Sequence, residues 1–396
     1  MLGKWPGCMW WWIGAALIAG LSLSAACGHS VDFGVAPPGQ PGPPLHQFAY
    51  VSNQGDDKIS EFSIDSKTGA LKLIGTASAG SASGLTGLVA TFRSHLVFAS
   101  NPTDSTISAF KFVPSGKSAG ILKPLKVTST GAGTAPTALA LNLTGTFLYA
   151  TDVANNKLFE YSINGNTGAL KPIGAGSVPT GKMPVSVVAS AHSNALFLAN
   201  SGDGTISGFS IDTHGALKAT GFIGSLGGST PAAPQWLAVD STGTGIYDAD
   251  MFPGPGGSVS AFTLAGSGTA LVFVTGGPFP TTNLKGFPAW VTVDSPARFV
   301  YTANPFPNNN LSIYKIQSNA GLSTAVLAPV PALKLNSVTS DATGSFLYVT
   351  DIGQGFVFQF SINSSTGVPT AIAGSPVSTE NPPNAASHPF QVIVTR

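Results

Sequence analysis

The chain has 396 residues, of which 43% are hydrophobic and 9% charged, and it contains 48 Gly and 30 Pro. So few charged side chains exclude long solvated helices, and so many apolar residues exclude a disordered chain, because burying them offsets the entropy of ordering. A net charge of +1 provides no basic surface for nucleic acid. Many short strands joined by Gly- and Pro-containing turns remain as the expected structure.

The first 27 residues are typical of an export signal. Lys4 is the only charge ahead of an uncharged stretch, residues 9–26, that ends in small residues before Cys27. The run LSLSAAC ending at this cysteine resembles a bacterial lipobox, which implies that a lipid is attached to Cys27 and the preceding peptide removed. Ordinary signal peptidase cleavage and an uncleaved anchor remain alternatives, because small residues suit the first and the length just suits the second. All three export the rest of the chain.

Cysteine and proline usage describes the segment that follows the signal. Cys8 and Cys27 are the only cysteines, so we expect no disulfide, no thiolate nucleophile and no Cys-ligated metal in the exported part. Residues 28–45 are rich in Pro and Gly without a periodic pattern, which is typical of a tether. A folded domain without a cofactor is expected over residues 46–396.

Seven similar segments of about 50 residues repeat along this domain. Each begins with an apolar run in which an aromatic anchor is followed three residues later by Asn or Asp. The seven runs are FAYVSN (48–53), LVFASN (96–101), FLYATD (147–152), ALFLAN (195–200), GIYDAD (245–250), FVYTAN (299–304) and FLYVTD (346–351). A run with apolar and small polar residues at period two follows each, as in ISEFSI (59–64), which is the strand signature.

Two further strands complete each unit. Glycines in the next turn, which supply a positive φ, lead into a short last strand; they are Gly69, Gly120, Gly168, Gly215, Gly268, Gly321 and Gly367. Another apolar strand, such as PTALAL (136–141), precedes each anchor run. Four antiparallel strands in each of seven units predict an all-β, seven-bladed β-propeller. The last strand, PFQVIV (389–394), has no successor, so we expect it to pair with the N-terminal blade and close the ring.

Strings such as FAYVSN…ISEFSIDSKTGALKLIG and FLYATD…LFEYSINGNTGALKPIG resemble the lactonase-type propeller family over residues 46–396. That family includes 6-phosphogluconolactonase of the propeller type and the fungal muconate-lactonising enzyme, and it grades into surface proteins with YVTN-type repeats. The resemblance implies the seven-bladed fold. For activity, it implies His, Arg and Glu gathered on the face where each first strand begins and each second strand ends.

No catalytic residue can be transferred from this family by motif. Two arginines precede second strands at the opposite face and two glutamates lie inside third strands: Arg93, Arg298, Glu61 and Glu160. Glu380 is the only Glu expected in a loop of the implied face, and His388, which opens the last strand, is the only His there. His388 is therefore the one catalytic candidate, as a base for the water that attacks a lactone.

The Asn or Asp that ends each second strand provides candidate ligand positions. Short polar side chains here commonly accept backbone N–H groups and start the following turn. The alternative is that Asp152, Asp250 and Asp351, together with His388, bind a cation or a polyol at the mouth of the ring. Since no dense Asp-rich calcium loop is present, no metal site is assigned.

Two tryptophans occupy the same register in neighbouring blades, each two residues past a proline. Trp236 and Trp290 are expected to fill the space between blades, where large aromatic side chains commonly pack. The alternative is a stacking platform for a sugar or an aromatic ligand near the central channel.

These observations predict an exported, monomeric propeller that is anchored through Cys27 or free in the periplasm or outside the cell. We expect its loop-rich face to act as a binding or scaffold module for a small molecule, a glycan or a protein. A nucleic-acid partner is not expected. An active lactonase that hydrolyses a sugar lactone is the alternative.

Overall fold

The computed structural model describes residues 47–81, 84–190, 193–223, 233–251, 256–265, 268, 270–281, 287–305 and 310–395. The predicted signal, Cys27 and the predicted tether lie outside these residues. The described residues form strands and one single-turn 3-10 helix, η1 (Ala385–Ser387). In this part of the chain, no helix is long and apolar enough to cross a membrane.

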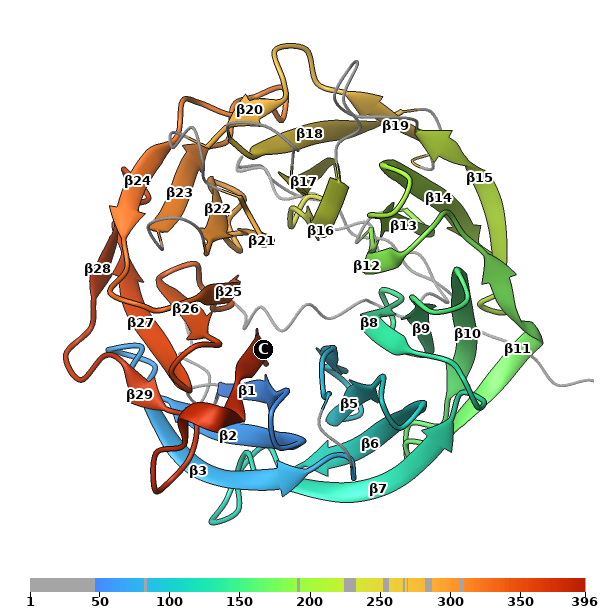
Figure 1. Ribbon diagram of the computed structural model, residues 1–396, viewed down its shortest axis with the longest axis horizontal. Helices are drawn as coiled ribbons and strands as arrows, with labels where there is room; N and C mark the ends of the chain where they lie inside the picture. The colour runs from blue at the N-terminus through green and yellow to red at the C-terminus, as the bar shows by residue number, and fades with distance from the viewer. Residues whose placement is uncertain are drawn as a thin grey trace, which may run out of the picture. The chain divides into compact units, whose positions relative to one another are not determined.

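Seven antiparallel sheets surround a central axis, so the predicted seven-bladed β-propeller is confirmed (Figure 1). Each blade begins with an inner strand next to the axis, many of them opened by Pro or rich in β-branched residues. From blade 1 to blade 7, the inner strands are β30 (Pro389–Val394), β4 (Leu88–Ala90), β8 (Pro136–Leu141), β12 (Pro184–Ala189), β16 (Ala233–Val239), β21 (Trp290–Val293) and β25 (Leu335–Ser340).

The second strand of each blade is the anchor run predicted from the sequence. These strands are β1 (Phe48–Asn53), β5 (Leu96–Asn101), β9 (Phe147–Asp152), β13 (Ala195–Asn200), β17 (Gly245–Met251), β22 (Phe299–Asn304) and β26 (Phe346–Asp351). Only β17 is longer than predicted, by one residue. We call the side of the ring on which these strands end, with the turns that follow them, the mouth face.

The third and outer strands complete each blade. The third strands are β2 (Lys58–Ile64), β6 (Thr106–Phe112), β10 (Lys157–Ile163), β14 (Thr205–Ile211), β18 (Ser258–Ala265), β23 (Asn310–Lys315) and β27 (Phe356–Ile362). The outer strands are β3 (Leu71–Ser78), β7 (Leu122–Ser129), β11 (Leu170–Pro179), β15 (Leu217–Ile223), β19 (Ala270–Phe273), β24 (Val326–Pro329) and β28 (Pro369–Ala371). The short strands β20 (Phe279–Pro280) and β29 (Val377–Ser378) also pair with the third strands of blades 5 and 7.

Blade 1 is built from both ends of the described chain. The C-terminal β30 pairs antiparallel with β1, with Tyr50 opposite Ile393. Beyond the pairing, the backbone N–H of Phe48 donates to Oγ1 of Thr395 at 3.0 Å. The predicted ring closure is therefore confirmed, and it removes the free edge that blade 1 would otherwise present.

The core consists of apolar clusters between successive blades, and the anchor tyrosines extend these contacts with hydrogen bonds. The hydroxyl of Tyr149 donates to the carbonyl of Gly215, in the outer turn of the next blade, at 2.9 Å. Three further tyrosines donate in the same way, Tyr50 to Gly120, Tyr301 to Gly367 and Tyr348 to Gly69. Anchor aromatic and turn glycine thus act together across the blade interface.

The turn glycines meet two requirements at once. Gly215 has a φ of +86°, and a Cβ at this position would lie 2.4 Å from the ring of Phe147 in the preceding blade. Six of the seven predicted glycines have a positive φ. The prediction is wrong for Gly321, because the left-handed position in that turn is taken by Ala320, with a φ of 61°.

Candidate functional site

Asp152 and Asp351 end their strands on the mouth face with fully buried side chains. Oδ1 of Asp152 accepts the backbone N–H of Ala135 at 2.9 Å, and Asp351 accepts those of Leu333 at 3.0 Å and Lys334 at 2.9 Å. Each carboxylate therefore ties the end of a second strand to the loop that enters the inner strand of its own blade. Among the described residues, no three His, Cys, Asp or Glu side chains come together as a metal site.

His388 lies on the mouth face, at the start of β30. Its side chain is exposed and its φ is 48°, in the left-handed region, where it ends the helix η1. Its carbonyl accepts the backbone N–H of Gln54 at 2.9 Å, and a Cβ at Gly55 would lie 3.1 Å from Nδ1 of His388. The histidine is thus held against the turn that follows β1.

A charged cluster that the sequence did not indicate lies on the same two segments. Nζ of Lys58 contacts Oε1 of Glu380 at 2.6 Å and Oδ2 of Asp56 at 3.1 Å. Lys58 and Glu380 are 322 residues apart in the chain and are brought together only by the closure of blade 1. The predicted place of Glu380 on the mouth face is correct, but its partner could not be read from local spacing.

The pKa values in this cluster favour a charged Lys58 beside a charged Glu380. Burial and the neighbouring Glu380 raise the pKa of Asp56, and hydrogen bonds to Glu380 and Asp56 raise that of Lys58. Burial opposes ionisation of Glu380, but hydrogen bonds from Asp56, Lys58 and Asn384 together lower its pKa. The cluster therefore offers an ammonium donor next to His388.

Trp236 and Trp290 form a close stack between the inner strands of blades 5 and 6. Their ring centroids are 3.3 Å apart with an interplanar angle of 20°, and Phe390 of blade 1 meets Trp290 edge-on at 6.2 Å. The equivalent residues in other blades are small or polar. Ser186 and Ser337, for example, accept a backbone N–H from the next inner strand. Aromatic contact replaces that hydrogen bond where the tryptophans stand.

Trp236 lies close to the axis of the ring. Besides Trp290, it packs against the apolar clusters between blades 3 and 4, between blades 5 and 6, and between blades 6 and 7. One side chain can reach all three only where the inner strands converge. Trp290 is 5% exposed and belongs to the core, whereas Trp236 stays partly exposed and presents an aromatic surface.

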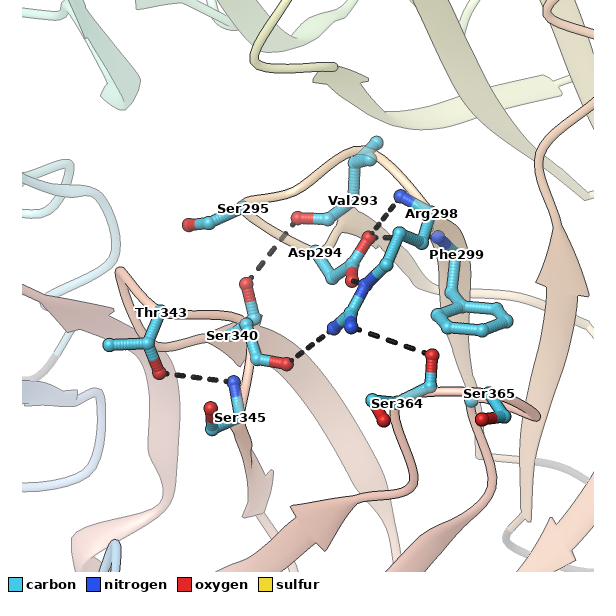
Figure 2. A network of polar contacts seen from close by, with 12 residues as sticks. Val293, Asp294, Ser295, Arg298, Phe299, Ser340, Thr343, Ser345, Ser364 and Ser365 are labelled. Carbon is cyan, nitrogen blue, oxygen red and sulfur yellow. Dashed lines mark hydrogen bonds and ion pairs between the residues drawn. The ribbon is translucent and has the colours of Figure 1, made fainter. Parts of the chain in front are cut away.

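The arginine nearest to the tryptophan blades has a structural role at the opposite face. Figure 2 shows Arg298 between two blades, with Nε 2.8 Å from Oδ2 of Asp294 and Nη2 donating to the carbonyl of Gly344 at 2.8 Å. Glu61 and Glu160 are buried and accept backbone N–H groups of the next blade, from Leu122 and Leu217. The predicted placement of these three residues away from the mouth is confirmed by these contacts.

A separate cavity of about 450 Å³ opens between the outer strands of blades 1 and 2. Its lining includes Asp104, Thr106 and Lys126, but none of the site residues predicted from the sequence. Asp104 is engaged there by Ser81, whose backbone N–H donates to Oδ2 at 2.7 Å.

Comparisons with known proteins agree with this architecture. A proposed 6-phosphogluconolactonase from Bacteroides fragilis matches with a TM-score of 0.74 and 18% identity, covering 90% of this chain and 100% of its own. The periplasmic gluconolactonase PpgL from Pseudomonas aeruginosa matches with a TM-score of 0.71 and 16% identity, covering 89% and 99%. No curated protein matches the sequence. The family model described as lactonase, 7-bladed beta-propeller matches residues 88–231 and 223–387, so the chain belongs to this lactonase family.

Proposed function

We propose that this protein is an exported propeller, anchored through a lipid on Cys27, that binds a small sugar-like ligand or glycan on its mouth face. The observation that carries the proposal is the partly exposed ring of Trp236, supported from behind by Trp290. Flat aromatic surfaces backed by a rigid core bind the apolar faces of sugar rings with little loss of side-chain entropy.

The placement of charged residues favours binding over catalysis. The family resemblance implies His, Arg and Glu on the mouth face, whereas Arg298, Glu61 and Glu160 make contacts between blades. Arg93 precedes β5 on the opposite side. A neutral ligand also suits a chain with a net charge of +1.

Export agrees with what is known of one structural relative. The Pseudomonas aeruginosa protein is described as periplasmic, and its propeller covers nearly the same length as this one. A lipid on Cys27 and the Pro/Gly-rich residues 28–45 would hold the ring at a distance from the membrane. Radiolabelled palmitate incorporated by the wild type and not by Cys27→Ala tests the anchor; labelling of both would contradict it.

Calorimetric titration of the full chain, purified in a mild detergent, tests the ligand site. D-Glucose, D-galactose, maltotriose and glucono-1,5-lactone serve as probes. We expect at least one probe to bind, Trp236→Ala to weaken its affinity tenfold or more, and Trp236→Phe to restore most of it. Phe92→Ala removes an aromatic that is 51% exposed on the opposite face and should bind like the wild type. Absence of binding, or equal binding by Trp236→Ala, would contradict the proposal.

Lactone hydrolysis is a second candidate, favoured by the contact of Lys58 with Glu380 beside His388. Hydrolysis requires a base for water and a donor to the developing oxyanion, and His388 and Lys58 could fill these two roles. Turnover of glucono-1,5-lactone and 6-phosphoglucono-1,5-lactone should then fall a hundredfold in His388→Ala and in Lys58→Met. His214→Ala, which changes an exposed histidine in an outer turn, is the control. Rates equal to the uncatalysed reaction would exclude this candidate.

A further inference from the structure

Asp248 is a carboxylic acid at a position of the core. It lies in the middle of β17, fully buried, opposite Leu237 of the inner strand. The equivalent residues of the other second strands are apolar in five blades and threonine in one: Val51, Ala99, Ala150, Leu198, Thr302 and Val349. Burying a carboxyl group costs free energy unless something compensates for it, so this position calls for a partner.

Three other oxygen-bearing side chains share its face of the blade. Asp250 is two residues along β17, and Ser260 and Ser258 of β18 stand opposite Asp248 and Asp250. Directly paired residues of neighbouring strands project to the same face of a sheet. The flanking Ile246 packs with residues of blade 4, so this group faces the interface between blades 4 and 5.

Four oxygens of this group lack hydrogen-bond partners among the described residues. They are both carboxyl oxygens of Asp248, Oδ1 of Asp250 and Oγ of Ser258, which is 5% exposed. Ser260 donates its hydroxyl hydrogen to Oδ2 of Asp250, which fits an ionised Asp250. The oxygens without partners therefore point to a ligand that accepts electron pairs from all of them.

A single proton would satisfy this group only in part. Burial, and then the charge of Asp250, raise the pKa of Asp248 well above its usual range, and burial raises that of Asp250 to about 6. A proton shared by the two carboxyl groups joins two oxygens and leaves the third carboxyl oxygen and Ser258 without a partner. A cation would neutralise the charge and coordinate all four oxygens.

We propose that Asp248, Asp250 and Ser258 form a buried binding site for a hard cation between blades 4 and 5. Carboxylate and hydroxyl oxygens are ligands for Ca²⁺ and Mg²⁺, and a site with so little exposure favours Ca²⁺, because Mg²⁺ gives up its water reluctantly. Asp250 ends β17 on the mouth face, so the cation fixes the base of the mouth. The site uses two carboxylates and a hydroxyl, and it does not depend on the proposed sugar ligand.

The test is titration of the chelator-treated full chain with CaCl₂, with MgCl₂ and NaCl for comparison, by calorimetry and thermal unfolding. We expect one Ca²⁺ per chain and a rise in Tm of roughly 5 °C at a hundredfold excess over Kd. Asp248→Val carries the residue of blades 1 and 7 and should fold, bind no Ca²⁺ and show a Tm that ignores calcium. Asp341→Asn, at a buried aspartate whose oxygens accept hydrogen bonds on the opposite face, should keep the calcium response.

Two results would overturn this site. One is a wild type whose Tm and heat signal do not change with any of the three cations, including the case in which only pH changes its Tm and a shared proton explains the pair. The other is calcium binding of unchanged affinity by Asp248→Val.

Discussion

Glu61 of blade 1 accepts the backbone N–H of Leu122, in the outer strand of blade 2, at 2.9 Å. Gln359 of blade 7 makes the same contact with Leu71 of blade 1, at 2.5 Å. A neutral amide thus serves as well as a carboxylate at this position. Since Glu61 is 1% exposed, the carboxylate pays for its desolvation without an ion pair.

The variant Glu61→Gln should remove a dependence of stability on pH. Burial raises the pKa of Glu61 to about 7, above its ordinary value, although the N–H of Leu122 opposes the shift. The folded state therefore binds this proton more tightly, so its stabilising contribution is complete below about pH 4.5 and is lost as pH rises to about 7. At pH 8 we expect the variant to exceed the wild type by roughly 1 kcal/mol in free energy of unfolding. Urea unfolding at pH 5 and 8 measures this, and parallel pH profiles for the two proteins would contradict it.

Two conservative tyrosine variants should differ in stability. Tyr149→Phe removes the hydroxyl that donates to Gly215 and leaves a buried carbonyl without this partner, at a cost of about 1 kcal/mol. Tyr247 is equally buried, but its hydroxyl has no hydrogen-bond partner among the described residues, so Tyr247→Phe should cost nothing or stabilise. Urea midpoints of the two variants provide the comparison. Equal losses would show that the hydrogen bond does not account for the difference.

Deleting residues 388–396 should abolish cooperative unfolding. The deletion removes β30 and exposes the pairing edge of β1, together with the inner face of the neighbouring blades. Differential scanning calorimetry should show a broad transition with much reduced enthalpy in place of a single peak. A truncated protein that melts like the full chain would mean that blade 1 is stable without its closing strand.

Arg298 should stabilise the ring without affecting the mouth face. Its side chain joins Asp294 of blade 6 to the carbonyl of Gly344 of blade 7, so Arg298→Ala should lose about 1 kcal/mol. Arg298→Lys should lose nearly as much, because a single ammonium cannot reproduce the two directions of the guanidinium. Chemical denaturation tests the first effect and titration with the sugar probes the second. A lysine variant as stable as the wild type would leave only a charge effect.

The local repeat explains why the sequence predicted the strands so well. An aromatic residue three positions before Asn or Asp marks each second strand, so six of these strands have the predicted bounds. The lone PFQVIV strand at the C-terminus had no partner within its own repeat, so it required the closure that Pro389 and its neighbours make. Both features depend on residues close together in the chain.

Contacts between blades were harder to predict, because they depend on how the ring closes. The ion pair of Lys58 with Glu380 joins the two ends of the domain, and no spacing rule announces it. The stack of Trp236 on Trp290 was foreseeable only as a shared register; its closeness depends on the convergence of the inner strands. Asp248 could have been found by aligning the repeats, as a polar residue in an apolar column.

Because β1 and β30 share one sheet, the order in which the blades follow one another along the polypeptide is arbitrary for the closed ring. Joining residue 395 to residue 47 by a short linker, and opening new termini in the exposed turn between β7 and β8, would yield a circular permutant with every sheet intact. Closure by a terminal strand therefore leaves the ring topologically free to begin at another blade.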